Sequence, residues 1–173
     1  SSDLSIPLVT TPTNLNRPDI DDVVSLYAAC AEAGVANIKV GYWPWSTEDD
    51  YWQRVKEVRA DLEGFAELSR DYGVRTCIHN HSGTNMGLNA CSAMDLVEGF
   101  DPAEIGVFAD PGHLSIVGEP IDMALDIVKD YLAIVCFKDL MRQRIVQDGK
   151  ATWRTRVIRL GEGFGDWDTL LAT

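Results

Sequence analysis

Short apolar runs alternate along this chain with longer segments in which apolar residues recur every three or four positions. Runs of four to six apolar residues, bounded by turn-forming residues, predict β-strands. The chain has five such runs, at residues 6–10, 35–40, 74–78, 105–109 and 132–137. The longer segments have helical spacing. They predict helices over 18–33, 52–72, about 92–98 and 121–128, and a loop at 162–167 that leads into a last helix.

Capping residues set the expected ends of the two longest helices. Pro18 suits the first helical position, where its missing N–H costs nothing, and Gly34 supplies the stop. Ser46-Thr47, followed by two aspartates, resembles a capping box for the longest helix, and Gly73 ends it.

Strand–helix repetition with fully apolar strands predicts an α/β fold with a parallel sheet covered by helices. A doubly wound sheet that binds dinucleotides has a glycine-rich first turn, whereas the turn at 11–14 has no glycine. Polar residues instead follow several strands, as they do at the active-site face of a (β/α) barrel. A complete barrel needs about 250 residues. The 173 residues and five strands therefore predict an incomplete (β/α) TIM-type barrel with outer helices, or a smaller sheet.

Composition and charge limit the classes of partner and the location expected for this domain. The formal charge of −12 argues against nucleic acid, because phosphate binding needs a cationic patch. No apolar run approaches the length of a membrane span, and the first ten residues do not have the pattern of a signal peptide. The four cysteines are widely spaced and three of them stand in apolar or regular segments, which favours free thiols. A cytoplasmic location is expected, unless a signal peptide has been removed.

Two histidines flank Asn80 at the end of the third predicted strand. Residues two apart on a strand share a face, so His79 and His81 can converge on one ligand, about 6–7 Å apart along the chain. Neutral imidazoles in this arrangement suit a transition metal or a polyol hydroxyl. The plainer alternative is two polar residues where the strand gives way to a loop.

Asp110 directly follows the fourth predicted strand, and the third histidine, His113, stands three residues later. A Pro-Gly turn between them would direct His113 back to the same site, although Asp-Pro-Gly is also a common turn sequence. A carboxylate and an imidazole are ordinary metal ligands. Lys138, after the fifth strand, could orient a substrate oxyanion or an aspartate, and Asp139 could anchor Lys138 or begin a turn. A plain surface ion pair is the alternative.

Two further motifs lie in predicted loops. The three glycines of 161–165 permit a close-approaching loop, for which phosphate binding is a weak hypothesis, and Asp166 can cap the helix that follows. Trp43 and Trp45, after the second strand, could stack on a sugar ring or pack against the long helix.

In their order and spacing, these motifs resemble those of the xylose-isomerase-like TIM-barrel superfamily of sugar isomerases and epimerases. The shared landmarks run from about Gly34 to Trp167: they are Ile78-His79-Asn80-His81, Asp110-Pro111-Gly112-His113, Lys138-Asp139, and Gly161-Glu162-Gly163 with Asp166. The resemblance implies a single partial barrel over 1–173, from about the family's third strand to its seventh helix. Either further chain segments or a second copy of the chain would then complete the barrel.

The resemblance also implies a divalent metal (Mn, Mg, Co or Zn) and proton transfer next to a sugar carbonyl. By this resemblance Asp110 matches a metal ligand, His113 a ligand or substrate contact, and Lys138 a substrate-side position. From this resemblance and the motifs above, we expect Asp110 and His79 to hold the metal. Catalysis is expected from His79, His81, His113 and Lys138, and substrate binding from Trp43, Trp45, Asn80 and Glu162. Many relatives have a glutamate at the position of His79 and a histidine at that of Cys136. Cys136 could ligate zinc as a thiolate or lie in the core.

The expected function is therefore a sugar or keto-polyol isomerase or epimerase with a small carbohydrate as substrate. A dehydratase or lyase acting on a keto-sugar is the first alternative, because it shares the initial proton abstraction. A non-catalytic sugar-binding or scaffold relative is the second, favoured by the departures at His79 and Cys136.

Overall fold

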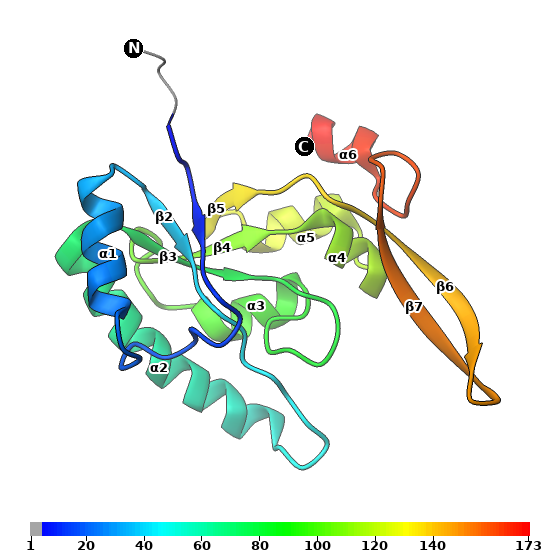
Figure 1. The fold of residues 1–173 in the computed structure, drawn as a ribbon. Coiled ribbons are helices and arrows are strands. Elements are labelled where there is room, and N and C mark those ends of the chain that lie inside the picture. The colour runs from blue at the N-terminus through cyan, green and yellow to red at the C-terminus, as the bar shows by residue number, and fades with distance from the viewer. Residues whose placement is uncertain (1–4) are drawn as a thin grey trace.

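A computed structural model describes residues 5–173, in which five parallel strands form one sheet in the order β1-β2-β3-β4-β5 (Figure 1). The strands are β1 (Val9–Thr10), β2 (Asn37–Lys39), β3 (Arg75–His79), β4 (Ile105–Ala109) and β5 (Leu132–Val135). All five predicted strands are confirmed. Strands that follow one another in space as they do in the chain are typical of a (β/α) barrel, whereas a doubly wound sheet reverses its order part-way.

The helices form a layer along one side of this sheet. They are α1 (Val23–Glu32), α2 (Tyr51–Tyr72), α3 (Ala90–Val97), α4 (Pro111–Val117), α5 (Ile121–Val128) and α6 (Trp167–Ala172). α1 contacts α2, α2 contacts α3, and α3 contacts α5, which is the arrangement of an outer ring of helices. Between the helices and the strands lies an apolar core that includes Ile38, Leu62, Phe65, Leu96 and Ile105. No helix of residues 5–173 has the length and apolar character needed to cross a bilayer.

Two helix starts differ from the sequence prediction. α1 begins at Val23 rather than near Pro18, because Asp22 takes a left-handed φ of +68° that an α-helix cannot pass through. The N-cap of α2 is Asp50, whose Oδ1 accepts from the Gln53 N–H at 2.8 Å, and not the Ser46-Thr47 pair. The predicted stop at Gly73 is confirmed, with φ +65°.

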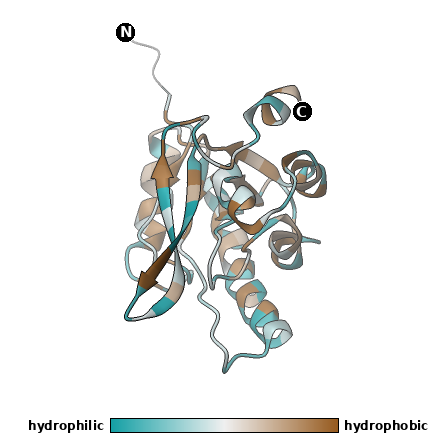
Figure 2. Ribbon diagram, turned by 90° about the vertical axis from the view of Figure 1, so that its right-hand side faces the viewer, coloured by the Kyte–Doolittle hydropathy of each residue, from teal (hydrophilic) through white to brown (hydrophobic). Residues whose placement is uncertain are grey.

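A long antiparallel hairpin, which no apolar pattern predicted, projects from the sheet after β5 (Figure 1). Its strands are β6 (Asp139–Gln147) and β7 (Lys150–Ile158), joined by Asp148 and Gly149, both at positive φ. Figure 2 shows apolar as well as polar residues along both strands. Trp153 and Val157 are 56% and 70% exposed. Residues 139–159 carry six of the fifteen Lys and Arg residues and two acids, a net +4 against −16 for the rest of the chain.

Candidate active site

The carboxyl ends of β3, β4 and β5 lie side by side, because β4 pairs with β3 on one side and with β5 on the other. His79 ends β3, Asp110 directly follows β4, and Lys138 comes three residues after β5. Side chains at this edge of a parallel sheet converge, as the barrel hypothesis requires. The structure brings His79, Asp110, His113 and Lys138 into one cluster and places His81 beside His113.

Asp110 is the centre of this cluster, with a side chain only 1% exposed. Its Oδ2 lies 3.0 Å from Nε2 of His79 and 3.9 Å from Nε2 of His113, and it pairs with the ammonium of Lys138. Burial acts to raise the pKa of Asp110, but the hydrogen bonds from His79 and Lys138 outweigh it and hold the pKa well below its usual range. Asp110 is therefore ionised at neutral pH.

Asn80 fixes the backbone at Asp110. The Asp110 N–H donates to Oδ1 of Asn80 at 2.6 Å, and Nδ2 of Asn80 donates to the Asp110 carbonyl at 3.1 Å. The buried Asn80 amide is thus engaged with the strand end. Its substrate contact stays a prediction, and its position makes it a residue that holds Asp110 in place.

Pro111-Gly112-His113 begins helix α4 instead of forming the expected turn. Asp110 caps the helix, with Oδ1 accepting from the His113 N–H at 3.1 Å, and Pro111 occupies the first helical position. A Cβ at Gly112 would lie 2.5 Å from the Lys138 carbonyl oxygen, so only glycine lets α4 approach this closely. The helix start returns the His113 imidazole to Asp110, as the turn was expected to do.

The cluster also includes Lys39, on β2 itself, to which no motif pointed, and Tyr42, from the aromatic run at 41–45 that follows β2. The Tyr42 hydroxyl donates to Nδ1 of His79 at 2.7 Å while Nε2 of His79 faces Asp110, so both nitrogens of this imidazole are engaged. Burial raises the pKa of Tyr42 to about 12, which keeps its hydroxyl protonated. The ammonium of Lys39 lies 3.7 Å from the centroid of the Tyr42 ring.

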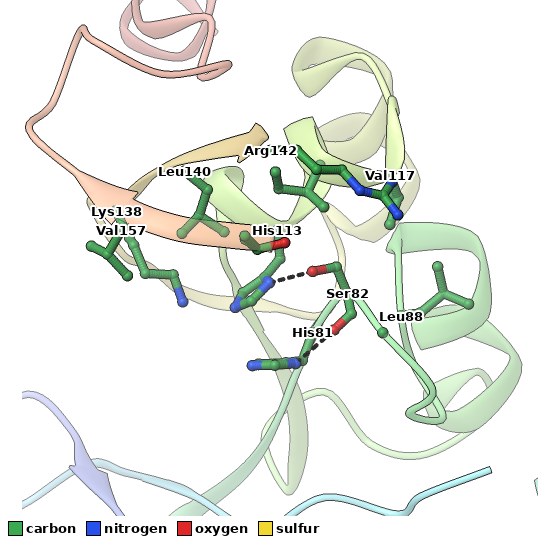
Figure 3. A pocket seen from close by; sticks show the side chains of 12 residues that line it. His81, Ser82, Leu88, His113, Val117, Lys138, Leu140, Arg142 and Val157 are labelled. Carbon is green, nitrogen blue, oxygen red and sulfur yellow. Dashed lines mark hydrogen bonds between the residues drawn. The ribbon is translucent and has the colours of Figure 1, made fainter. Parts of the chain in front are cut away.

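Ser82 orients the other two imidazoles (Figure 3). Its hydroxyl lies 2.8 Å from Nδ1 of His113, and its carbonyl accepts from Nδ1 of His81 at 2.9 Å. Because a carbonyl only accepts, this shorter contact places the His81 proton on Nδ1 and leaves a lone pair on Nε2, although Nδ2 of Asn85 also lies 3.3 Å from Nδ1. The two rings lie 3.8 Å apart, centroid to centroid.

Burial lowers the pKa of all three histidines, to about 3 for His113. The imidazoles are therefore neutral at pH 7, the state in which a nitrogen lone pair can bind a metal or accept a proton.

His79, Asp110 and His113 each offer one ligand atom, and these atoms lie within 4.8 Å of one another. Nε2 of His113 is buried and has no hydrogen-bond partner among residues 5–173, which is costly for a polar atom unless something binds there. Two imidazoles and one carboxylate form a donor set that suits a divalent transition metal. The residues therefore fit the expected metal ion.

Asp139 does not anchor Lys138 but holds the glycine loop. It is fully buried and accepts from the N–H groups of Leu140, Gly161, Gly163 and Gly165 and from the Trp167 indole, at 2.9–3.1 Å. Hydrogen bonds from Trp167 and from the glycine N–H groups hold the pKa of Asp139 below its usual value despite burial. The loop N–H groups thus surround a carboxylate of the chain itself. The phosphate-binding hypothesis for this loop is wrong, because its donors are already used.

The remaining predicted substrate contacts lie outside the cluster. Trp43 is 3% exposed, and its indole N–H donates to Oδ2 of Asp61 on α2 at 2.9 Å, which is the packing alternative. Trp45 is half-buried against the core, and its indole N–H has no partner among residues 5–173. Glu162 is exposed on the glycine loop. Their substrate contacts stay predictions.

Cys136 lies beside Asp110 and is half-buried. Burial and the charge of Asp110 raise the pKa of its thiol to about 12. The thiol is thus protonated at neutral pH when no metal is bound, and its role as a zinc ligand stays a prediction.

A cavity of about 700 Å³ opens beside the cluster, between the loop after β3, helix α4 and the base of the hairpin (Figure 3). This volume is in the range of small-molecule sites. His81, His113 and Lys138 line one part of it, and Arg142 and Val157 of the hairpin line another. Arg142, which no motif singled out, adds a cation to the wall.

The family model for xylose isomerase-like TIM barrels matches residues 2–173. The chain therefore belongs to the xylose isomerase-like TIM-barrel family, and its fold is a partial barrel of that family.

Individual relatives are more distant. Inosose dehydratase of Lacticaseibacillus casei is 28% identical over 103 residues, which are 59% of this chain and 33% of that protein. A D-tagatose 3-epimerase-like protein superposes with a TM-score of 0.75 at 17% identity, over 98% of this chain and 66% of that one. The IOLI protein, whose crystal structure holds a zinc atom, does so with a TM-score of 0.67 at 16% identity, over 98% and 61%. The chain thus spans a third to two thirds of these proteins' lengths.

Proposed function

We propose that this chain abstracts a proton next to the carbonyl of a sugar or keto-polyol and acts as an isomerase or epimerase. The observation that carries the proposal is the cluster of His79, Asp110 and His113 beside a cavity, with one buried imidazole nitrogen that has no partner in the described part of the chain. A base and a charge-stabilising group at one face of a carbonyl compound are what proton abstraction requires.

His81 is the proposed base, because its Nδ1 donates to the Ser82 carbonyl and its Nε2 is free to take a proton at the cavity wall. Lys138, which also lines the cavity, steadies the negative charge that develops on the carbonyl oxygen. The hydroxyl of Ser82 holds His113 in the orientation that faces Asp110.

Asp110, His79 and His113 would hold a divalent metal. When bound, the metal polarises the substrate carbonyl as a Lewis acid. For its Nε2 to ligate, His79 takes the other tautomer, with Nδ1 donating to the Tyr42 oxygen. Manganese, magnesium, cobalt and zinc are the candidates, and two imidazoles favour zinc or cobalt over magnesium.

The test is exchange of solvent deuterium into the C–H next to the carbonyl of D-tagatose, D-fructose or an inosose, followed by proton NMR with each of the four metals. We expect exchange with at least one ketose and a product epimer or isomer. His81→Gln should slow the exchange by about 10²-fold or more. Lys56→Met, on the exposed face of α2, is the matched control and should leave it unchanged.

A dehydratase is the second candidate, favoured by the 28% identity to inosose dehydratase. It would show proton exchange together with loss of water and a new unsaturated or dicarbonyl product. Binding of a sugar with no exchange under any of the four metals would contradict both enzymatic proposals and leave a sugar-binding protein.

Lys138→Met is expected to raise the affinity for a divalent metal, roughly tenfold. The Lys138 ammonium pairs with Oδ2 of Asp110, so it competes with a metal for the same oxygen. Isothermal titration with zinc measures the change. Lys129→Met is the control, because Lys129 pairs with an exposed aspartate on α5. A weaker affinity in Lys138→Met would mean that Lys138 supports the metal site instead of competing for it.

A further inference from the structure

Lys39 is a buried lysine that forms no ion pair within residues 5–173. Its side chain starts from β2, which lies between β1 and β3 in the sheet, and the residue is 4% exposed. Among residues 5–173 its ammonium has no hydrogen bond and no ion pair, and its neighbour is the face of the Tyr42 ring. The two buried carboxylates are different: Asp110 pairs with Lys138 and His79, and Asp139 accepts five N–H groups.

The contact with Tyr42 does not compensate for the free-energy cost of burying Lys39. A cation–π contact offsets only part of the cost of removing an ammonium from water. Burial and the nearby charge of Lys138 lower the pKa of Lys39 to about 8, so the amine is still mostly protonated at neutral pH. A buried lysine with no ion pair among residues 5–173 is an arrangement found at functional sites.

Lys39 lies next to the candidate active site. The Tyr42 ring that covers its ammonium donates its hydroxyl to His79 and lies 4.7 Å from the His81 ring, centroid to centroid. Apart from the histidines, the ionisable groups named in this region are Lys39, Lys138 and Asp110, and the last two pair with each other. Among the described residues, Lys39 is therefore left as an unpaired cation beside the pair of Lys138 and Asp110, inside a chain whose formal charge is −12.

We propose that Lys39 binds a negatively charged group of the substrate, so that the sugar or polyol bears a carboxylate or a phosphate. The inference rests on the proposed function, because it names the substrate class of the same site. Lys39 supplies the cation for this group, because Lys138 pairs with Asp110 and is the proposed partner of the carbonyl oxygen. Arg142 is the competing assignment: it lines the cavity, which Lys39 does not, but it is exposed and stacks on Trp153, 5.5 Å from the ring centroid.

The test compares three ligands that share a ketose skeleton: D-fructose is neutral, D-fructuronate carries a carboxylate and D-fructose 6-phosphate carries a phosphate. Binding is measured by isothermal titration with the unaltered chain and with Lys39→Met, Lys56→Met and Arg142→Met. We expect one anionic ketose to bind at least ten times more tightly than fructose, and the ligand that does so identifies the group. Lys39→Met should bind all three equally, whereas Lys56→Met and Arg142→Met should keep the preference.

Equal affinity of the unaltered chain for the three ligands overturns the proposal, and so does a preference that survives in Lys39→Met or disappears in Arg142→Met. Circular dichroism checks that Lys39→Met folds, and Lys39→Gln replaces it if it does not. The outcome is separable from that of the proposed function. If only the function fails, tight anion binding persists without deuterium exchange; if only this inference fails, exchange occurs with no preference for the anionic ketoses.

Discussion

Asp110→Asn is expected to weaken divalent-metal binding by at least about 100-fold. Asp110 supplies the negative ligand of the proposed donor set, so the amide leaves two neutral imidazoles to hold a dication. The Asn side chain keeps the size of Asp and can still accept from the His113 N–H, so helix α4 should start at the same residue. Equilibrium dialysis with zinc and manganese measures the affinity, and circular dichroism measures the fold.

The same substitution removes the counter-charge of Lys138, and we expect deuterium exchange into the ketose to fall with metal binding. Asp126→Asn is the matched control, because Asp126 is an exposed aspartate on α5 that pairs with Lys129. Full metal affinity in Asp110→Asn would contradict the ligand assignment. A chain that loses metal but keeps its exchange rate would contradict the role of the metal instead.

Asp139→Ala is expected to have the largest effect on stability. The substitution leaves five N–H donors of a part-buried loop region without their acceptor. Because an unsatisfied donor costs about 1–3 kcal/mol where it is buried, we expect the free energy of unfolding to fall by about 3 kcal/mol or more. For a chain of this size the loss corresponds to a fall in Tm of roughly 6–12 °C. Differential scanning calorimetry measures it.

Asp166→Ala provides the comparison, because Asp166 is an exposed N-cap that accepts from the Thr169 N–H and typical caps contribute about 1 kcal/mol. A Tm for Asp139→Ala no lower than that of Asp166→Ala would show that water satisfies the loop donors. The glycine loop would then need no internal anion to keep its shape.

The sheet and the histidine cluster could be predicted because both depend on local pattern. Apolar runs identified the five strands, and the parallel order placed His79, Asp110 and Lys138 at one edge. The start of α4 was missed although its signal was present: an aspartate followed by proline is an N-cap and first helical residue as well as a turn.

The hairpin and the contributions from β2 could not be predicted in the same way. The hairpin strands are exposed over most of their length, so no buried face imposes alternation, and Asp148-Gly149 was the one local signal of their turn. Tyr42 stands beside Trp43 in an aromatic run, and sequence does not tell which of two neighbouring rings turns to the histidines. From sequence alone, Lys39 would be expected at the surface, because only the structure shows that its strand lies between two others.

The hairpin also makes the charge distribution of the molecule asymmetric. With +4 on a projecting arm and −16 on the remainder, the chain has a large electric dipole whose positive end is the hairpin. Near a negatively charged surface it would approach arm first in spite of its negative net charge. Added salt suppresses this orientation, since charges separated by more than about 10 Å are largely screened at 0.1 M ionic strength.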